Sequence, residues 1–340
     1  MKNKILVTGG AGYIGSHTIV DLLDNNFDVI SVDNFSRSYE SSLEGIKKIS
    51  GVPVKNYNLD ICNLSDLETV FQENDDIAGV IHFAAFKSVP ESIEHPLRYY
   101  QNNMNSLFNV LACCEKFDVE NIVFSSSCSV YGNPDTLPVT EKTPLKAAEC
   151  AYAATKQMGE EVVKDVAERT RLSSIALRYF NPVGAHTTAL LGEQSVDRPN
   201  NLLPIVTQTA AGLIEKMSVW GSDYDTRDGS CIRDYIHVMD IANAHTKALQ
   251  YLLSPTNKPS YQVLNLGSGN GVSVLEIIEA FEKVSGEKLN YELGPRREGD
   301  VIAVYADNSE AQSVLDWEVT YDTEDMLKTA WDWQKQLLKS

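Results

Sequence analysis

The stretch Ile5–Gly15 reads Ile-Leu-Val-Thr-Gly-Gly-Ala-Gly-Tyr-Ile-Gly. Its apolar beginning is typical of a buried strand, and the residues from Tyr13 to Asn25 follow a helical pattern. Glycine is needed where a backbone turns tightly, approaches a pyrophosphate or packs against a strand. The N–H groups and the dipole at the start of the helix then favour phosphate. The spacing Gly9-x-x-Gly12-x-x-Gly15 therefore predicts a dinucleotide-binding loop between a strand and a helix.

An acidic residue follows the next predicted strand, Val29–Val32, and stands 18 residues after Gly15. The carboxylate of Asp33 can accept hydrogen bonds from a ribose 2′-hydroxyl and would repel a 2′-phosphate, so NAD is favoured over NADP. Arg37 nearby weakens this preference. The alternative is a structural glycine turn with an N-capping aspartate, but strand, loop, helix and acid all stand in the order that nucleotide binding requires.

Outward from this motif, short apolar runs alternate with amphipathic stretches, which is typical of an α/β fold with a doubly wound parallel sheet, the Rossmann fold. We expect strands at 80–83, 122–125 and 174–179, and helices at 64–73, 97–117 and 152–169. After Asn181, Pro and Gly interrupt the pattern, and helices are expected at 202–215, 240–253 and 274–284. We predict an NAD-binding domain at 1–180 and a smaller α/β substrate-binding domain at 181–340, with a segment around 236–268 returning to the first sheet.

Composition limits the partners and the compartment. The chain has 340 residues and a net charge of −18, so we expect neither nucleic acid nor an anionic membrane as a partner. No stretch reaches 18 apolar residues, and the first residues do not form a signal peptide. The six cysteines form no Cys-x-x-Cys pair, which favours a cytoplasmic protein with free thiols. The six histidines lack metal-ligand spacing, so we expect no metal.

A tyrosine and a lysine stand four residues apart at Tyr152 and Lys156, on one face of a predicted helix. A lysine cation and a positively charged nicotinamide would lower the pKa of the phenol, as a general base for a sugar hydroxyl requires. The pair alone is a weak signal. It gains weight from the glycine loop upstream and from Ser127, at the end of a predicted strand, which can hydrogen-bond the reacting oxygen.

Across nearly its whole length the chain resembles the extended short-chain dehydrogenase/reductase family. The resemblance rests on ten stretches, which are Thr8–His17, Asp33-Asn34, Asp60-Ile61, Phe83–Val89, Phe124–Gly132, Tyr152 with Lys156, Arg178–His186, Asn200–Pro204, Arg233–Asp240 and Gly294–Asp300.

The resemblance implies that NAD is the cofactor and that Ser127, Tyr152 and Lys156 are catalytic, with Tyr152 and Lys156 also touching NAD. Phe180 would close on the nicotinamide. The other implied NAD contacts are Gly9, Gly12, Tyr13, Ile14, Gly15, Asp33, Asn34, Ser36, Ser38, Asp60, Ile61, Phe83, Ala84, Ala85, Lys87, Asn102 and Ser125.

The resemblance also implies a UDP-hexose substrate, epimerised by oxidation and re-reduction at C4, and a homodimer paired through the helices near 97–117 and 152–169. Arg233 and Arg297 would hold the diphosphate. The other implied substrate contacts are Lys87, Ser127, Tyr152, Asn181, Asn201, Leu202, Ser218, Val219, Trp220, Asp300 and Val304.

Departures from the family pattern leave alternatives open. Val304 stands where some members carry tyrosine, and the smaller residue predicts some activity on UDP-N-acetylhexosamines. A nucleotide-sugar 4,6-dehydratase is disfavoured, because such enzymes carry Asp-Glu where this chain has Cys128-Ser129. An epimerase for a UDP-uronate or UDP-pentose would need different contacts to carbon 6. A non-catalytic NAD sensor would not need the general base Tyr152.

Overall fold

The computed structural model describes residues 3–196, 199–255, 259–296 and 301–339. Its largest element is a seven-stranded parallel sheet in the order β10-β6-β5-β4-β1-β2-β3. The strands are β1 (Lys4–Thr8), β2 (Asp28–Val32), β3 (Lys55–Tyr57), β4 (Ile77–His82), β5 (Asn121–Ser127), β6 (Ser173–Tyr179) and β10 (Tyr261–Leu266). The predicted parallel α/β fold is confirmed.

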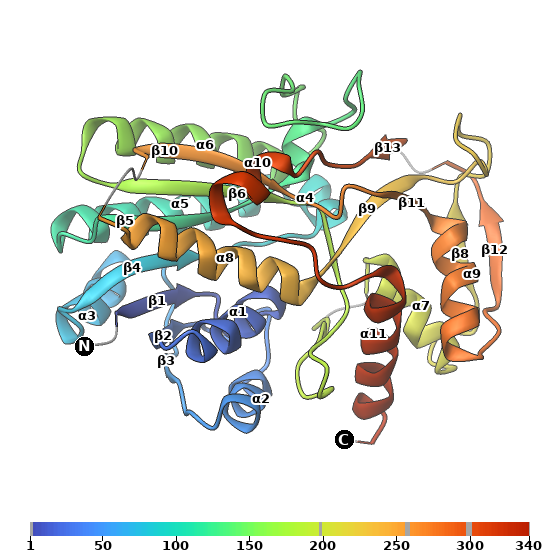
Figure 1. The fold of residues 1–340 in the computed structure, drawn as a ribbon, viewed down its shortest axis with the longest axis horizontal. Coiled ribbons are helices and arrows are strands. Elements are labelled where there is room, and N and C mark those ends of the chain that lie inside the picture. Colours follow the sequence, from blue (N-terminus) through green and yellow to red (C-terminus); the bar gives the residue numbers. More distant parts are fainter. Residues whose placement is uncertain (1–2, 197–198, 256–258, 297–300, 340) are drawn as a thin grey trace.

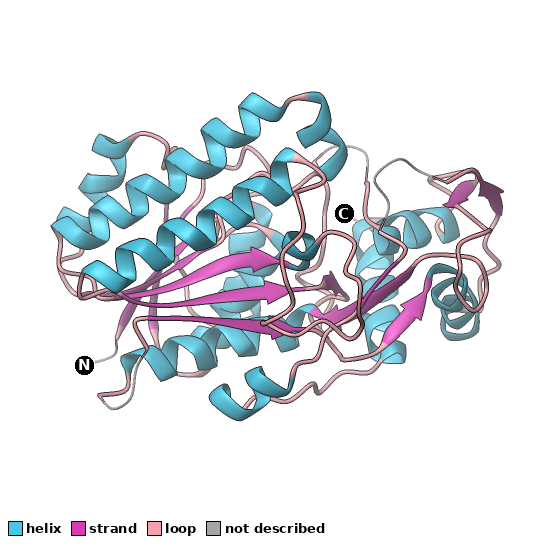
Figure 2. Cartoon of the chain, turned by 90° about the horizontal axis from the view of Figure 1, so that it is seen from above, coloured by secondary structure: helices cyan, strands magenta, loops and turns pink. Residues whose placement is uncertain are grey.

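Helices cover both faces of this sheet (Figures 1 and 2). One apolar cluster joins the sheet to α3 (Leu64–Glu73), α5 (Pro96–Lys116) and α6 (Ala151–Arg169). A second cluster joins the opposite face to α1 (Tyr13–Asp24), α2 (Ser41–Ser50), α8 (Val238–Leu253) and α10 (Ser309–Leu315). The short α4 (Val89–Glu94) contacts α5 and α6.

The parallel register brings the carboxyl ends of the strands to one edge. Val7 pairs with Ser31 of β2 and with Ile81 of β4, so the glycine loop, Asp33 and Phe83 follow neighbouring strand ends. Ser127 of β5 pairs with Tyr179 of β6 at the same edge. Ligands of open parallel sheets bind at this edge, so the register alone gathers residues from five strands at one place.

The rest of the chain builds smaller sheets beside that edge (Figure 1). One contains β7 (Asn181–Val183), β9 (Ile232–His237), β11 (Gly271–Ser273) and β13 (Ala303–Val304), and another pairs β8 (Met217–Trp220) with β12 (Tyr291–Gly294). A third apolar cluster packs them against α7 (Leu202–Ala210), α9 (Val274–Ser285) and α11 (Thr323–Leu337).

Three details of the structure bear on the expectations from the sequence. Helix α7 ends at Ala210, not near 215, because Gly212 adopts a left-handed conformation with φ +74° that stops the helix. Strand β10, at 261–266, pairs with β6 in the large sheet, while the proposed division into domains at residue 180 stays a prediction. His237 ends β9 and caps α8, its ring accepting a hydrogen bond from the N–H of Met239.

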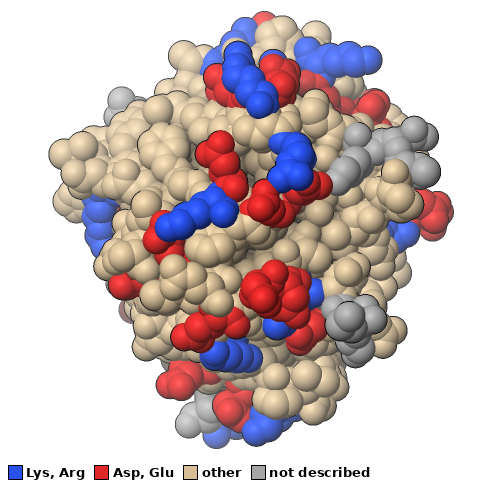
Figure 3. All heavy atoms as spheres, turned by 90° about the vertical axis from the view of Figure 1, so that its left-hand side faces the viewer, with Lys and Arg blue, Asp and Glu red and all other residues tan. Residues whose placement is uncertain are grey.

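Charges on the face drawn in Figure 3 are mixed, with acidic side chains next to basic ones and no continuous basic patch. Ion pairs such as Lys4–Asp76 and Lys116–Glu68, both at 2.7 Å, neutralise many basic side chains locally. None of the helices in the described ranges combines the length and the apolar character that crossing a membrane requires.

Candidate active site

The glycine loop has no room for side chains. A Cβ on Gly15 would lie 2.3 Å from the carbonyl oxygen of Gly9, and one on Gly9, at φ +72°, would lie 2.9 Å from the nitrogen of Ala84. Gly12 caps α1 without a side chain. The first N–H groups of α1 have no earlier helical carbonyl to bond. The loop is therefore a compact cradle of backbone donors, as the sequence predicts.

Asp33 is held rigidly beside this cradle. Its Oδ2 accepts a hydrogen bond from the N–H of Ala11 at 3.0 Å. Its Oδ1 accepts one from the N–H of Phe35 at 2.9 Å and one from the hydroxyl of Ser38 at 2.7 Å. Asn34 is exposed and accepts a bond from the N–H of Ser36. The carboxylate thus ties the loop to the end of β2 and keeps lone pairs for a ribose hydroxyl.

Tyr13 and Arg37 have other partners than a nucleotide. The Tyr13 hydroxyl donates to the carbonyl of Gly184 at 2.6 Å, so only its backbone can serve a pyrophosphate. Arg37 pairs with Glu91 at 2.5 Å and lies over the ring of Phe86. Because Arg37 is engaged by Glu91, the structure strengthens the preference for a ribose hydroxyl over a phosphate.

The loop after β4 carries Phe83, Ala84, Ala85 and Lys87, and one asparagine fixes it. Asn103, on α5, accepts a bond from the N–H of Phe86 at 2.8 Å and donates to its carbonyl at 3.1 Å. It also donates to the hydroxyl of Thr155 on α6. The neighbouring Asn102 donates to Asn103, and Asp60 caps the backbone at Cys62 beside the buried Ile61.

The predicted catalytic residues meet where β5 ends and α6 begins. The Nζ of Lys156 donates to the carbonyl of Ser125 at 2.5 Å and lies 5.9 Å from the centre of the Tyr152 ring. Ser127 is within hydrogen-bonding distance of the Tyr152 hydroxyl, and this bond only partly opposes the rise in the pKa of Tyr152 that burial causes. Ser125 bonds the hydroxyl of Tyr179 on β6. Phenol, hydroxyl and ammonium are therefore neighbours, as the four-residue spacing predicts.

The sequence predicts a lowered pKa for Tyr152, and this prediction is wrong for this structure. Burial raises the pKa of Tyr152, and nearby Tyr179 raises it further, because both disfavour the phenolate. The pKa that is lowered is that of Lys156. Burial lowers it to about 8, although the negative charge of Glu160 opposes the change. Both side chains therefore resist carrying charge in this pocket.

A buried ion pair lies next to the residues that are predicted to be catalytic. Arg178, on β6, donates from Nε to Oε1 of Glu160 at 2.8 Å and from Nη2 to Oε2 at 2.5 Å. Ser126 donates to the same carboxylate, and Arg178 also donates to the hydroxyl of Tyr131. Glu160 is one helical turn beyond Lys156, so this pair braces the helix that carries both catalytic groups.

The predicted sugar-nucleotide contacts come from separate segments. Asn181 begins β7, and its Oδ1 is buried with no hydrogen-bond partner among the described residues, so this acceptor is available to a ligand. Asn201 and Leu202 start α7. Ser218, Val219 and Trp220 lie on β8, paired with β12. Arg297 and Asp300 lie outside the described residues.

Arg233 and Val304 are direct neighbours, because they pair across β9 and β13. Burial raises the pKa of Cys128 to about 12, and the positive charge of Arg233 opposes this rise, so that charge lies near the end of β5. Val304 is buried in a cluster with Phe180, Tyr131, Val130, Val139 and Ala306. Phe180 therefore packs beside the proposed sugar wall.

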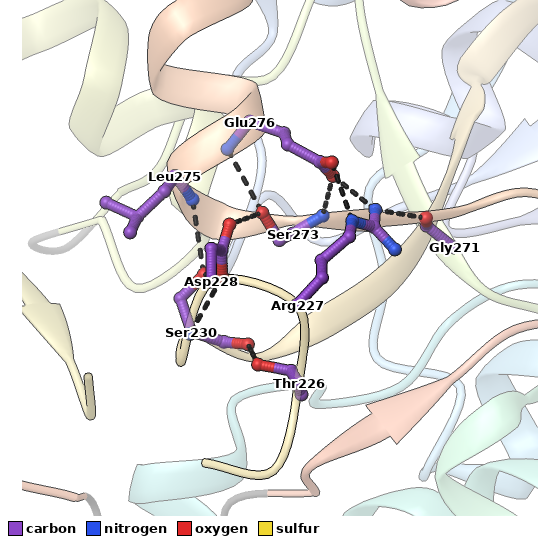
Figure 4. A network of polar contacts seen from close by, with 8 residues as sticks. All are labelled: Thr226, Arg227, Asp228, Ser230, Gly271, Ser273, Leu275 and Glu276. Atoms are coloured by element: carbon purple, nitrogen blue, oxygen red, sulfur yellow. Dashed lines mark hydrogen bonds and ion pairs between the residues drawn. The ribbon is translucent and has the colours of Figure 1, made fainter. Parts of the chain in front are cut away.

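A polar network holds the segment that leads into β9 (Figure 4). The hydroxyl of Ser273 donates to Asp228, which also accepts a bond from the N–H of Ser230 at 2.9 Å. Arg227 donates to Glu276 and to the carbonyl of Gly271. The same Ser273 and Glu276 form the capping box of α9. The network fixes the strand that carries Arg233 against the helix behind it.

Three residues that the sequence did not single out complete the site. They are Asn103, Glu160 and Glu193. Each of them binds a residue in one of the stretches on which the family resemblance rests. Asn103 and Glu160 lie inside helices. The sequence signal that could have found them is a polar residue at a helical position where an apolar one is expected. Glu193 stands in an irregular segment without a motif. Its partners become apparent only in the folded chain.

Comparison with known proteins places this geometry in a family. The family model described as GDP-mannose 4,6 dehydratase matches residues 6–330. A UDP-glucose 4-epimerase from Bacillus subtilis is 46% identical over 331 residues, covering 97% of this chain and 96% of the relative.

Two solved structures agree. A UDP-glucose 4-epimerase from Bifidobacterium longum, in complex with NAD+ and UDP, is 43% identical with a TM-score of 0.94, and 98% of each chain is covered. A UDP-Glc/GlcNAc 4-epimerase from Campylobacter jejuni is 38% identical with a TM-score of 0.84, covering 98% of this chain and 99% of that one. The chain belongs to the extended short-chain dehydrogenase/reductase family, in its branch of UDP-glucose 4-epimerases.

Proposed function

We propose that this chain is an NAD-dependent isomerase that interconverts UDP-glucose and UDP-galactose at C4 of the sugar. The observation that carries the proposal is the meeting of Ser127, Tyr152 and Lys156 at the carboxyl edge of a sheet whose glycine loop suits a dinucleotide. The relatives named above carry the same activity in their names.

The loop residues fit NAD. The cradle that excludes a Cβ at Gly9 and Gly15 lets a pyrophosphate approach the start of α1. Asp33 accepts hydrogen bonds from the adenine ribose, and its charge disfavours a 2′-phosphate. Phe83, Ala84 and Ala85 line the next strand end, and Asn103 fixes their loop. The other predicted cofactor contacts, among them Asp60 and Phe180, are proposed on the family resemblance.

In the proposed mechanism Tyr152 takes the proton from the sugar 4-hydroxyl. NAD, when bound, supplies the acceptor and later the donor of the C4 hydride, together with a positive nicotinamide charge. We propose that the Lys156 cation, the hydrogen bond from Ser127 and the nicotinamide charge together stabilise the phenolate against the burial that raises the pKa of Tyr152. The 4-keto sugar turns in the cleft, and Tyr152 returns the proton to the new hydroxyl.

The residues on the sugar-nucleotide side keep the UDP group in place while the hexose turns. The unpartnered Oδ1 of Asn181 accepts a hydrogen bond from the sugar nucleotide, and Arg233 supplies positive charge for the diphosphate in an acidic protein. On the family resemblance we also propose, as contacts of the same ligand, Asn201, Leu202, Ser218, Val219 and Trp220, and Arg297 and Asp300, which lie outside the described residues. Cys128 and Ser129 offer no carboxyl pair for eliminating water, which disfavours a dehydratase.

Val304 favours a broader sugar range. It is buried beside Arg233 and Phe180, and its short side chain leaves space that a tyrosine would fill. We propose that UDP-N-acetylglucosamine and UDP-N-acetylgalactosamine are also substrates. An assay with UDP-N-acetylgalactosamine that yields no product would contradict this extension.

We further propose a homodimer formed through α5 and α6. The proposal rests on the family resemblance, and it is supported by Leu97, Phe108 and Met158 on these helices, whose apolar side chains are 67%, 46% and 45% exposed in the single chain and could be buried by a second copy. Light scattering at assay concentration that gives the single-chain mass of 37.7 kDa would contradict the dimer.

The six free cysteines support a reducing, cytoplasmic compartment. Fractionation of the source cells that recovers the chain outside the cytoplasm would contradict this placement.

The direct test is to incubate the purified chain with UDP-galactose and follow UDP-glucose by proton NMR, first without added NAD and then with it. We expect UDP-glucose to form. Absence of product in both conditions, with UDP-xylose and a UDP-uronate also unchanged, would reject the proposed activity and leave the fold in place.

A further inference from the structure

Glu193 connects two parts of the site that lie far apart in the sequence. Its Oε1 accepts a hydrogen bond from Nζ of Lys87 at 2.8 Å and another from Nδ2 of Asn201 at 2.7 Å. Lys87 belongs to the loop after β4, on the cofactor side. Asn201 caps α7, on the sugar-nucleotide side. One carboxylate oxygen therefore joins two predicted ligand-binding side chains.

The carboxylate is the fixed member of this group. The indole N–H of Trp333, on α11, donates to the backbone carbonyl of Glu193 at 2.9 Å. A Cβ on the preceding Gly192 would lie 2.4 Å from the Trp333 ring, so the backbone is packed tightly against it. The side chain of Glu193 is 11% exposed, whereas that of Lys87 is 60% exposed. Glu193 thus positions Lys87 rather than the reverse.

The same segment also touches the start of α1. The carbonyl of Gly184 accepts the hydrogen bond from the Tyr13 hydroxyl, and after burial the charge of Glu193 is the next cause that raises the pKa of Tyr13. The carboxylate therefore lies near the helix that follows the glycine loop. Its hydrogen bonds reach Lys87 on the cofactor side and Asn201 on the sugar-nucleotide side.

We propose that Glu193 is a positioning residue that fixes Lys87 and Asn201 in one arrangement and thereby couples the two halves of the site. This inference rests on the proposed function. Lysine has a long, flexible side chain, and ordering it when the ligand binds costs entropy. A carboxylate that orders Lys87 beforehand removes that cost from ligand binding. Loss of Glu193 should therefore weaken UDP-sugar binding more than it slows the chemical step.

The test compares Glu193→Ala and Glu193→Gln with the wild type, measuring KM and kcat for UDP-galactose. Glu68→Ala is the matched control, because Glu68 forms a similar pair with Lys116 at 2.7 Å, between α3 and α5. A hydrogen bond to a charged group contributes more than one between neutral groups. We expect KM to rise by about tenfold or more in Glu193→Ala, with kcat within about threefold. Glu193→Gln keeps an acceptor and should recover part of the loss.

A double-mutant cycle separates positioning from a general effect on stability. If Glu193 acts through Asn201, the KM of the double variant Glu193→Ala/Asn201→Ala should rise less than the product of the two single effects. The melting temperature of each variant and the NAD that it retains through gel filtration are measured in parallel.

An unchanged KM in Glu193→Ala, or multiplicative effects in the double variant, would overturn the inference. If Glu193→Ala does not fold, the same cycle is measured with Glu193→Gln, Asn201→Ala and the double variant that combines them. A wild-type chain without turnover would instead reject the proposed function, so the two failures are distinguishable.

Discussion

The proposed cofactor side and the proposed sugar side of the site are built in different ways. On the cofactor side, Asp33 accepts hydrogen bonds from Ala11, Phe35 and Ser38. This one carboxylate therefore holds the glycine loop and the end of β2 together. On the sugar side, Asn181, Asn201, Trp220, Arg233 and Val304 come from five segments that only the tertiary fold brings together.

This difference has a functional meaning. A cofactor that is regenerated in each cycle can be held by a rigid, locally determined cradle. A hexose that must turn between two hydride transfers needs a wall assembled from several segments, in which single residues adjust the space. Changes on the cofactor side should therefore remove activity, whereas changes on the sugar side should alter which substrate is used.

The largest effect should come from Tyr152→Phe, which removes the acid–base group. General acid–base catalysis contributes about a hundredfold to ten-thousandfold, so we expect turnover of UDP-galactose to fall by about a thousandfold. The bound NAD, measured by absorbance after denaturation, should stay near the wild-type amount. Turnover within tenfold of the wild type would mean that another group moves the proton.

Asp33→Ala should have the next largest effect. It removes the ribose acceptor and also the bonds that hold Ala11 and Ser38, so NAD affinity should fall by about tenfold to a hundredfold. NADP should bind relatively better, since the repelling charge is gone. Calorimetric titration with both nucleotides tests this, and an unchanged NAD-to-NADP ratio would contradict the assigned role.

The pH dependence should reflect Lys156. Because its pKa is lowered to about 8, its ammonium is present below that pH and is lost above it, well before a solvent-exposed lysine would lose its proton. At pH 9 about a tenth of the cation remains, so kcat should be about tenfold below its plateau. Rates measured from pH 6 to pH 10 that stay level above pH 8 would remove Lys156 from the mechanism as a cation.

Val304→Tyr should have the smallest effect and should act on selectivity. Filling the space beside Arg233 and Phe180 should reduce kcat/KM for UDP-N-acetylgalactosamine by about tenfold and change that for UDP-galactose little. Val304→Ile is the matched control, because it adds only one methylene group. An equal reduction for both sugars would show that Val304 affects the fold of the wall and not its selectivity.

The contrast between the two sides also explains what the sequence could predict. The glycine loop and Asp33 belong to one strand–helix–strand unit, and Tyr152 and Lys156 to one helical turn, so the sequence could predict these groups, although Ala84 from the next strand end also confines Gly9. The parallel sheet follows from the alternation of apolar runs and helical stretches.

Other features depend on long-range contacts and escape sequence reasoning. The pKa of Tyr152 is raised because β5 and β6 bury the phenol beside Tyr179, a neighbour that no local spacing indicates. The short strands β3, β8, β12 and β13 contain two to four residues each, too few for a periodic pattern. Glu193 acquires its role only when α11 and the loop after β4 meet around it.

The account is tested most directly with UDP-galactose that carries deuterium at C4, incubated with the chain in ordinary water. If the hydride leaves C4 and returns within the same closed site, the UDP-glucose formed should retain deuterium at C4, as measured by mass spectrometry and proton NMR. UDP-glucose with ordinary hydrogen at C4 would show exchange with solvent, and would contradict hydride transfer in a site built around Tyr152.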